Sequence, residues 1–516
     1  MNSIRTIEDT PLPAVFRDEA HLEELMSTPT LQNYIGGEWT PSTASTTVPV
    51  FNPSTGEIIA GTPLSPAADV DQAVQAAAKA FPGWSETPVY KRATLLFQYK
   101  ALLELHFTEI AQLITRENGK TFAEAQGDVR RGIEVVEFAC GIPHLLKGET
   151  LPQIAAVMDG ASTLEPLGVC AGITPFNFPA MVPMWMFPLA IACGNCFILK
   201  PSEKVPLTAN RLAELFAEAG LPAGVFNIVH GGREVVEAIC THPGIATVSF
   251  VGSSSIAERV YQLGCGSGKR VQAAGGAKNV MLVMPDADPD STVRAIMGAA
   301  FGCAGQRCMA GSIVMGIGPA GQGVVDRLHA ATDALKVLRT DQSPESEMGP
   351  VIDGGARDRL FSLIEKAGSE GASIVRDGRS GIPSSGFFVG PTLLDHVTPG
   401  MSLARTELFG PVLSIGRPES LDAAINWING GGYGNGAVIF TRDGGAAREF
   451  SRRVQCGMIG VNVGVPAPMA VFSFSGWNRS FFGDLHVQGM EGIRFYTRQK
   501  VVFSRWDNDY VRTMGW

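Results

Sequence analysis

The longest segment without charge places the strongest constraint on the fold. Between Glu165 and Lys200 the chain has no charged residue, so this apolar segment must be buried in a membrane or in a protein core. It contains several prolines, namely Pro166, Pro175, Pro179, Pro183 and Pro188. Prolines would break a membrane-spanning helix repeatedly and leave backbone polar groups without partners in lipid. The segment is therefore expected to form a strand, a loop and a helix in a globular core.

Charge and cysteine content narrow the class of protein further. The 516 residues include 41 basic and 50 acidic side chains, a net charge of −9, and no Lys/Arg cluster suggests a nucleic-acid or membrane partner. Nine scattered cysteines do not resemble a secreted disulfide framework, and the acidic residues 1–30 contain no apolar signal sequence. A cytoplasmic location is expected. The Cys193/Cys196 pair is interpreted as core packing, so no metal is expected.

The pattern of strands and helices predicts an α/β fold. Helical spacing of apolar residues covers residues 67–81, 91–119 and 121–141. Short apolar strands at 168–173, 195–199, 225–229 and 247–251 then alternate with helices, and a similar alternation runs from 280 to 439. Such alternation is typical of parallel sheets that are covered on both faces. We therefore expect two parallel-sheet α/β lobes that meet near residues 275–278.

One cysteine is a candidate nucleophile. Cys308 lies among small residues in the segment 301–311, Phe-Gly-Cys-Ala-Gly-Gln-Arg-Cys-Met-Ala-Gly, where a substrate could approach. The neighbouring Arg307 is expected to favour the thiolate, which is the nucleophilic form. A cysteine beside an arginine could also be an ordinary core residue, so the hypothesis depends on the rest of the chain.

Several further motifs give the chain a family resemblance. They are residues 174–179 (Thr-Pro-Phe-Asn-Phe-Pro), 200–203 (Lys-Pro-Ser-Glu), 220–227 (Gly-Leu-Pro-Ala-Gly-Val-Phe-Asn), 250–253 (Phe-Val-Gly-Ser), 305–308 (Gly-Gln-Arg-Cys) and 407–411 (Glu-Leu-Phe-Gly-Pro). In this order and at these separations, they resemble the aldehyde dehydrogenase superfamily from about Asn33 to Lys500. The resemblance implies an aldehyde dehydrogenase-like α/β fold with a small oligomerisation element.

The resemblance also implies how the reaction proceeds. Cys308 would attack the aldehyde to form a tetrahedral thiohemiacetal, whose collapse transfers hydride to NAD and leaves a thioester on the enzyme. Asn177 and the backbone N–H of Cys308 would hold the developing oxyanion.

The cofactor site follows from the same resemblance. Its implied residues are Thr174 and Phe176 on the nicotinamide side, Lys200 and Glu203 at the adenosine ribose, Lys204 beside them, Ser253 at the pyrophosphate, Gly275, and Glu407 at the nicotinamide ribose. The carboxylate of Glu203 would accept hydrogen bonds from a free 2′-hydroxyl and repel a 2′-phosphate, which favours NAD over NADP.

One departure from the superfamily indicates the branch. Hydrolytic members carry Glu-Leu-Gly-Gly-Lys at the lobe boundary, whereas residues 274–278 here are Ala-Gly-Gly-Ala-Lys. Ala274 replaces the glutamate that activates water, and no Asp or Glu occurs between Arg259 and Pro285. Without that base a thiol becomes the better acyl acceptor. This pattern resembles methylmalonate-semialdehyde dehydrogenase, which passes its acyl group to coenzyme A, as do residues 276–279, 306–310, 433–436 and 492–500.

That resemblance implies a substrate with a carboxylate. Arg131 and Arg307 match the arginines that would bind it, and a planar guanidinium can hold a carboxylate with two hydrogen bonds. The expected reaction oxidises malonate semialdehyde or methylmalonate semialdehyde, releases CO₂ and forms acetyl-CoA or propionyl-CoA. Two alternatives remain open: a non-acylating dehydrogenase of another acidic or polar aldehyde, and a binding protein that has lost turnover.

The expected domain organisation completes the prediction. Residues 1–30 form an N-terminal extension, 31–150 and 166–275 an NAD-binding domain, and 276–465 a catalytic domain. Residues 151–165 and 466–516 form an oligomerisation element and a tail, which is rich in aromatic residues and expected to be irregular. That tail either covers a subunit interface or packs within its own chain. Family habit implies a homo-oligomer, either a tetramer or a dimer.

Overall fold

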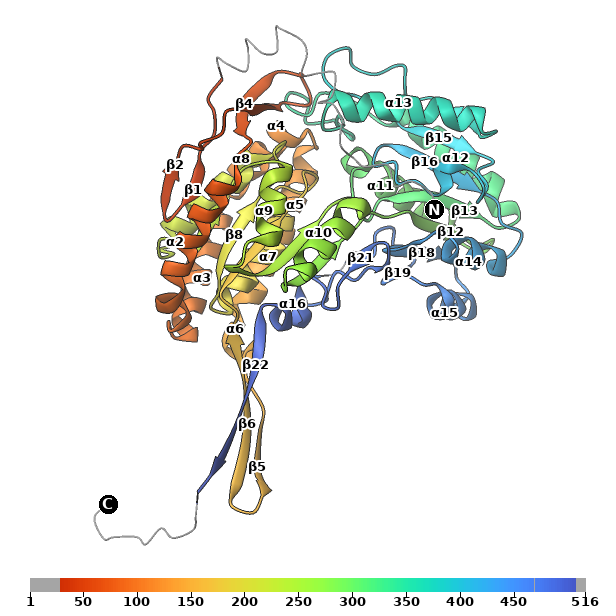
Figure 1. Cartoon of the computed structure of the whole chain (residues 1–516). Helices are drawn as coiled ribbons and strands as arrows, with labels where there is room; N and C mark the ends of the chain where they lie inside the picture. The colour runs from red at the N-terminus through yellow and green to blue at the C-terminus, as the bar shows by residue number, and fades with distance from the viewer. Residues whose placement is uncertain (1–27, 468, 507–516) are drawn as a thin grey trace, which may run out of the picture.

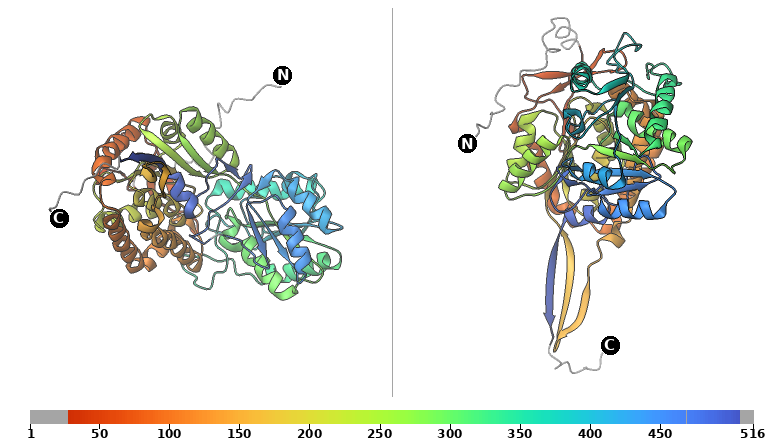
Figure 2. Two further views of the ribbon diagram at one scale, coloured as in Figure 1. Left: turned by 90° about the horizontal axis from the view of Figure 1, so that it is seen from below. Right: turned by 90° about the vertical axis from the view of Figure 1, so that its right-hand side faces the viewer.

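Two large sheets and a projecting arm make up the molecule. The computed structural model describes residues 28–467 and 469–506, so most of the predicted N-terminal extension and the end of the tail lie outside the described residues. Two α/β lobes lie side by side, and a three-stranded arm extends away from the first of them (Figures 1 and 2). Within the described residues, no helix is long and apolar enough to cross a membrane.

The first lobe is built on an eight-stranded sheet. In spatial order its strands are β2 (Glu38–Thr40), β1 (Asn33–Ile35), β9 (Phe226–Ile228), β8 (Cys196–Lys200), β7 (Val169–Ile173), β10 (Ile245–Val251), β11 (Arg270–Ala274) and β21 (Phe481–Phe482). Strands β9 to β11 are parallel, whereas β1, β2 and β21 are antiparallel additions at the edges. The four strands predicted from the sequence form the centre of this sheet.

Helices cover both faces of the first sheet. They are α2 (Ala67–Ser85), α3 (Val89–Leu105), α4 (Phe107–Asn118), α5 (Phe122–Cys140), α6 (Ile142–Leu145), α7 (Met181–Ala192), α8 (Pro206–Glu218), α9 (Arg233–Thr241) and α10 (Ser254–Gly266). The charge-free segment supplies β7, α7 and most of β8, and every residue of α7 after Met181 is buried. Cys193 and Cys196 are free, buried thiols, in agreement with their interpretation as core residues.

The second lobe contains a seven-stranded sheet. Its order is β14 (Ser373–Arg376), β15 (Thr392–Asp395), β16 (Val412–Gly416), β13 (Gly311–Gly316), β12 (Asn279–Val283), β18 (Gly436–Phe440) and β19 (Met458–Val461), and only β14 is antiparallel. Its helices are α11 (Pro289–Phe301), α12 (Pro319–Ala334), α13 (Gly354–Ser369), α14 (Leu421–Asn429) and α15 (Gly444–Arg453). Strands β11 and β12 flank the segment where the two lobes were predicted to meet. The domain limits themselves stay predictions.

The prediction of a single helix over residues 91–119 is wrong, because the structure has two helices there. The chain forms two helices, α3 and α4, which meet at His106 with φ −96° and ψ 14°. Both helices contact α5, and both contact α8. The break lets each of them turn a buried face toward those helices, and apolar spacing alone does not reveal such a change of direction.

The arm consists of β5 (Thr150–Ala155), β6 (Met158–Pro166) and β22 (Thr497–Arg505), paired antiparallel. Smaller two-stranded sheets pair β3 (Thr47–Phe51) with β4 (Ile58–Pro63) and β17 (Tyr433–Gly434) with β20 (Trp477–Asn478). The described part of the tail is more regular than expected, because it supplies β20, β21, α16 (Gly489–Phe495) and β22. Its aromatic residues divide: Phe474, Phe495 and Tyr496 are buried within the chain, whereas Phe472 and Phe503 are exposed.

The buried side-chain amide of Asn195 is one of the groups that join the tail to the first lobe. Asn195, with no exposed surface, accepts hydrogen bonds from the backbone N–H groups of Leu167 (2.7 Å) and Gly168 (3.1 Å). Its side-chain NH₂ donates to the carbonyls of Ala190 (3.0 Å) and Tyr496 (2.9 Å). Asn195 therefore satisfies four backbone groups from three separate parts of the chain.

Replacement of this amide is expected to destabilise the whole first lobe. Asn195→Ala removes the side-chain partner of the N–H groups of Leu167 and Gly168 and of the Tyr496 carbonyl, whereas the Ala190 carbonyl still accepts from the backbone N–H of residue 195. A lost partner costs about 1–3 kcal/mol per buried group, so we expect a loss of about 3 kcal/mol in the free energy of unfolding. Urea denaturation followed by circular dichroism measures the change. Asn426→Ala, at an exposed position of α14, is the matched control. An unchanged urea midpoint for Asn195→Ala would contradict the assignment.

Candidate active site

Cys308 lies in a turn between helix α11 and strand β13 of the second lobe. Helix α11 ends at Phe301 and is followed by a short 3₁₀ helix, Gly302–Gly305, in which Cys303 and Ala304 have positive φ values of 51° and 50°. The turn then closes with a hydrogen bond from the N–H of Ala310 to the carbonyl of Arg307 (3.0 Å). Cys308 is one of the two central residues of this turn, and the residue as a whole is partly exposed.

Two buried asparagines hold the backbone of this turn. The carbonyl of Cys308 accepts hydrogen bonds from the side chains of Asn279 (2.9 Å) and Asn435 (2.8 Å). Asn279 also donates to the carbonyl of Ala310 (3.0 Å) and accepts from the N–H of Gly436 (3.0 Å). The turn that carries the thiol is thereby attached to β12 and to the start of β18.

The structure brings Cys308 and both predicted carboxylate-binding arginines to one cavity. The cavity has a volume of about 470 Å³. Arg131 reaches it from α5 and Arg307 from the nucleophile turn, and Phe178, Trp185 and Phe474 supply apolar walls, among other lining residues. A cavity of this size, with an apolar wall and a few polar groups, suits a small ligand. Its two guanidinium groups favour a small ligand with a negative charge.

Arg307 lines this cavity and has one buried N–H group without a hydrogen-bond partner. Its guanidinium lies 3.4 Å from Glu124, and its Nε–H is buried without a partner. Gly302 makes room for it, because a Cβ there would lie 2.5 Å from Nη2. Arg131 is more exposed and pairs with Glu134 at 2.8 Å. At either arginine an entering carboxylate would therefore share the cation with a resident carboxylate, which is Glu124 beside Arg307 and Glu134 beside Arg131.

The surroundings of Cys308 favour the neutral thiol over the thiolate. Burial, followed by the charge of Glu407, raises the pKa of Cys308 to about 12, although the N–H groups of Cys308 and Met309 and the charge of Arg307 lower it. The effect expected of Arg307 on the thiolate is therefore present but outweighed. The pKa of Arg307 is raised by Cys303 and Glu124, although burial lowers it, and its guanidinium contacts Glu124.

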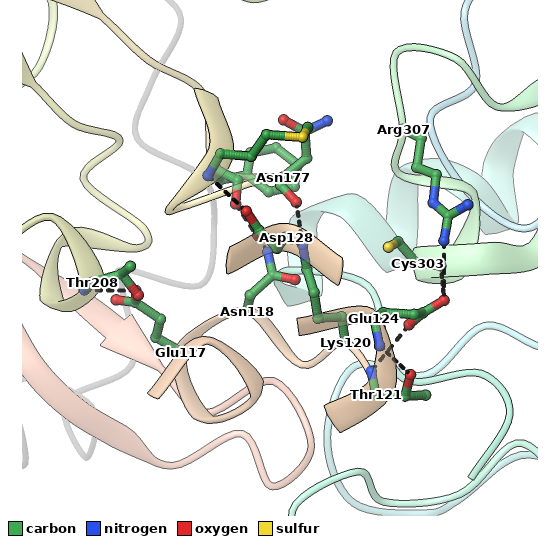
Figure 3. A network of polar contacts seen from close by, with 12 residues as sticks. Glu117, Asn118, Lys120, Thr121, Glu124, Asp128, Asn177, Thr208, Cys303 and Arg307 are labelled. Carbon is green, nitrogen blue, oxygen red and sulfur yellow. Dashed lines mark hydrogen bonds and ion pairs between the residues drawn. The ribbon is translucent and has the colours of Figure 1, made fainter. Parts of the chain in front are cut away.

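A buried ion pair fixes the loop that carries Asn177 (Figure 3). Lys120 lies 2.9 Å from Asp128, and both side chains are almost fully buried. Lys120 also donates to the carbonyl of Asn177 (2.7 Å), while Asp128 accepts from the N–H of Met181 (2.7 Å) at the start of α7. Asn118 donates to the carbonyl of Phe176 (2.9 Å). The backbone of the loop is thus held from α4 and α5.

Glu124 connects the first lobe to the nucleophile segment. It forms a capping box with Thr121 at the start of α5, and the same carboxylate accepts from the N–H of Cys303 (2.5 Å) and lies near Arg307. A carboxylate in the first turn also complements the positive end of the helix dipole. Through Glu124, α5 and the turn containing Cys308 are held in a fixed relation (Figure 3).

A second cavity lies beside the predicted cofactor residues. Its volume is about 430 Å³, and its lining includes Phe176, Lys204, Asp353 and Phe409. Lys204 forms an ion pair with Asp353 (2.6 Å), which joins the two lobes across this cavity. Lys200 and Glu203 are the two residues predicted to lie at the adenosine ribose. Lys200 is buried at the end of β8 and pairs with Glu203 at 2.9 Å.

The remaining predicted cofactor residues lie at the junction of the lobes. Thr174 follows β7, and its N–H donates to the carbonyl of Lys200 (3.1 Å). Ser253 is exposed at the N-terminus of α10, and the N–H of Gly275 donates to the carbonyl of Ser480 (2.9 Å). Glu407 accepts from the N–H of Ala277 (2.9 Å), and burial raises its pKa to about 6.

The position of Ala274 bears directly on hydrolysis. Ala274 ends β11 and is buried, with 2% of its surface exposed. The carboxylates that line the Cys308 cavity have other partners: Glu124 pairs with Arg307, Asp128 with Lys120, and Glu134 with Arg131. Across the described parts of the chain, no group of three or more His, Cys, Asp or Glu residues could hold a metal ion. The cavity is lined by the thiols of Cys303 and Cys308, by two arginines and by these three paired carboxylates, among other residues.

A thiol lies at the junction of two α/β lobes, and a separate cavity lies beside it, so the chain has the architecture of a two-lobed enzyme. The chain belongs to the aldehyde dehydrogenase family, whose model matches residues 39–502. It is 52% identical over 479 residues to malonate-semialdehyde dehydrogenase 2 of Geobacillus kaustophilus, covering 92% of this chain and 99% of that one.

Solved structures give the same picture. The methylmalonate-semialdehyde dehydrogenase of Oceanimonas doudoroffii is 48% identical, with a TM-score of 0.91 over 93% of this chain and 99% of that one. A second structure, solved with NAD, is of a Sinorhizobium meliloti protein assigned as a methylmalonate-semialdehyde dehydrogenase. It is 45% identical with a TM-score of 0.91, covering 93% of this chain and 98% of that one. The resemblance to the superfamily and the predicted α/β fold are confirmed.

Sequence reasoning missed the supporting residues of the site. It gave no role to Lys120, Asp128 or Glu124, and it used Asn279 and Asn435 only as marks of resemblance. A signal for Asp128 was present, since it shares a helix face with Ala125 and Val129, which are fully buried. A carboxylate on such a face must have a buried partner, although the sequence does not identify it.

The protonated state of Cys308 leads to a pH prediction. Because its pKa is raised, the thiolate fraction at pH 7 is small and grows about tenfold per pH unit below that pKa. Alkylation of Cys308 by iodoacetamide, without substrate or NAD, is therefore expected to accelerate steadily from pH 7 to pH 10. The measurement uses peptide mass mapping with Cys265→Ser, because Cys265 is an exposed thiol. A rate that levels off near pH 7 would contradict the prediction.

Proposed function

We propose that this protein oxidises malonate semialdehyde or methylmalonate semialdehyde with NAD and transfers the resulting acyl group to coenzyme A. The observation that carries the proposal is the cavity that Cys308 shares with Arg131 and Arg307. The names of the relatives, which are malonate- and methylmalonate-semialdehyde dehydrogenases, support the same substrate class.

The two arginines suit the carboxylate of such a substrate. A semialdehyde of malonate has its aldehyde and carboxylate separated by one carbon, so the nucleophile and the anion-binding groups must lie close together. Arg307 is adjacent to Cys308 in sequence and carries an unpartnered Nε–H, whereas Arg131 approaches from α5. Bidentate binding by a guanidinium would orient the substrate with its carbonyl carbon toward the thiol.

Oxidation would proceed through a thioester on Cys308. The thiolate adds to the carbonyl carbon, and the side chain of Asn177 with the N–H of Cys308 stabilises the negative oxygen that forms. NAD, when bound, accepts the hydride lost by the tetrahedral adduct. Lys120 and Asn118 hold the backbone of the Asn177 loop, so the donor is fixed before the substrate arrives.

Carbon dioxide would then leave from the acyl-enzyme. The C–C bond to the carboxylate breaks, its electron pair is delocalised into the thioester carbonyl, and the carbon is protonated. The product is an acetyl thioester from malonate semialdehyde or a propionyl thioester from the methyl homologue. The thiolate of coenzyme A attacks this thioester, and the electron pair of the C–S bond returns to Cys308. Buried Ala274 offers no carboxylate to activate water in its place.

The residues beside the second cavity fit NAD. Glu203 offers a carboxylate at the end of β8, Ser253 is exposed before a helix N-terminus, and Phe176 lines the cavity wall. A carboxylate suits ribose hydroxyl groups, and a helix N-terminus suits a pyrophosphate. The proposed cofactor residues are Thr174, Phe176, Lys200, Glu203, Lys204, Ser253, Gly275 and Glu407.

The arm supports a proposal of self-association. Leu151 and Ile154 on β5 and Val501, Val502 and Phe503 on β22 are apolar and exposed by 46–60%. Such a patch on a projecting sheet favours contact with another surface. We propose that the partner is a second copy of the chain, within a dimer or a tetramer.

Coenzyme A dependence tests the proposed acceptor. With malonate semialdehyde and NAD, we expect steady NADH formation in the presence of coenzyme A, with acetyl-CoA as product. Without it, about one NADH per Cys308 should form, followed by a slow phase, because the thioester lacks a base to activate water. Absorbance at the NADH band and product mass spectrometry provide the readouts. A steady rate that coenzyme A does not alter, with a free acid as product, would favour the non-acylating alternative.

Substitution of the arginines tests carboxylate recognition. Arg307→Lys keeps the charge but loses the planar fork, and Arg131→Ala removes a cation. Each is expected to lower kcat/KM for malonate semialdehyde by about 10- to 100-fold, the equivalent of one charge-assisted hydrogen bond. Activity toward propanal, which has no carboxylate, should change little.

Arg130→Ala is the matched control. Arg130 lies on the exposed face of α5 and pairs with Glu104 of α3. Equal losses with both aldehydes would indicate a general disturbance of the site rather than a loss of carboxylate binding.

A further inference from the structure

The orientation of one peptide group determines the environment of the Cys308 thiol. Cys308 and Met309 are the two central residues of the turn closed between Arg307 and Ala310. In such turns the central peptide can adopt two opposite orientations, which distinguish type I from type II turns. One orientation directs the N–H of Met309 toward the side of the thiol, and the other directs it away. Met309 lies outside the left-handed region, and its N–H lowers the pKa of the Cys308 thiol, as the N–H of Cys308 does.

The carbonyl of this same peptide is held by the two buried amides. Asn279 and Asn435 both donate to it, at 2.9 Å and 2.8 Å, and they are only 6% and 2% exposed. Asn279 is itself fixed, because its other N–H donates to Ala310 and its oxygen accepts from Gly436. Neither asparagine lies in the turn, so they hold the peptide against the sheet of the second lobe from outside.

We propose that Asn279 and Asn435 are positioning residues that act on the nucleophile through the Cys308–Met309 peptide. By holding the carbonyl, they keep the N–H of Met309 directed at the sulfur of Cys308. Hydrogen bonds to a carbonyl also polarise the attached N–H, which strengthens its bond to a thiolate. The pair therefore stabilises the thiolate without contacting the thiol, the substrate or the cofactor.

We call Asn279 and Asn435, with the carbonyl that they hold, the clamp. Other charged groups near the thiol are distinct from it. Glu407 opposes the thiolate and Arg307 favours it. Around the shared cavity lie Glu124, Asp128, Glu134 and Arg131, together with the thiol of Cys303. None of these forms part of the contacts given above for Asn279 and Asn435, so replacing an asparagine leaves those groups in place.

Alkylation of Cys308 as a function of pH tests the proposal. In the full chain with Cys265→Ser, we expect Asn279→Ala and Asn435→Ala to slow alkylation by iodoacetamide about tenfold at pH 8.5, which corresponds to a rise of one unit in the thiol pKa. The whole rate profile should move to higher pH. Asn279→Ser and Asn435→Ser, which retain a donor, should show smaller shifts and serve if the alanine variants do not fold.

Asn429→Ala is the matched control. Asn429 also bridges two backbone groups of the second lobe, the carbonyl of Arg453 (3.0 Å) and the N–H of Gln455 (2.8 Å), and it does not contact the turn. Its alkylation profile should match that of the parent. Profiles of the Asn279 and Asn435 variants that superimpose on the parent would overturn the proposal, as would an equal shift in Asn429→Ala.

The importance of the clamp rests on the proposed function, since that function makes Cys308 the nucleophile. The two claims fail separately, because alkylation requires neither aldehyde nor NAD. If the Asn279 and Asn435 variants are alkylated more slowly than the parent, as expected, but the parent forms no NADH, the proposed function is overturned and the clamp stands. NADH formation with identical alkylation profiles would overturn only the clamp.

Discussion

The buried ion pair between Lys120 and Asp128 is the interaction on which the candidate site depends most. It joins the start of α5, the N-terminus of α7 and the carbonyl of Asn177, which come from separate parts of the chain. A charge pair without solvent requires further hydrogen bonds to offset its desolvation, and this pair has them. Because both ions are enclosed, the loop between β7 and α7 has little freedom to move. The amide of Asn177 can therefore be preorganised.

The lobes contribute complementary groups to the site. Among the residues that line the cavities at Cys308, the first lobe supplies Arg131, whereas the second supplies Cys308, Arg307 and Glu407. Contacts between the lobes determine whether these groups lie at the right separation. Glu124 reaches from α5 to the N–H of Cys303, and Lys204 reaches from the first lobe to Asp353. Movement of one lobe relative to the other would thus disturb both cavities.

Much of the fold could be predicted from the sequence. The charge-free segment and the alternation of strands and helices indicated two parallel sheets, which the structure confirms. The break at His106 could not be predicted, because both helices carry continuous apolar spacing and only tertiary contacts separate them. The motifs singled out Cys308 and the two arginines, and the structure places all three around one cavity, while their roles stay predictions.

The groups that hold the reactive residues in place were less visible. Asn279 and Asn435 are separated by more than a hundred residues in sequence, yet they donate to one carbonyl. No local pattern connects them, because strands β12 and β18 become neighbours only in the folded sheet. The raised pKa of Cys308 is likewise a result of burial, which the arginine beside it in sequence does not offset.

The central claim is that a thioester on Cys308 waits for a thiol rather than for water. The most direct test mixes the protein with NAD and malonate semialdehyde, omits coenzyme A, quenches with acid and determines the mass of the Cys308 peptide. The account predicts an acetyl group on Cys308 that persists until coenzyme A is added and then appears as acetyl-CoA. An unmodified Cys308 alongside continued NADH formation would contradict it.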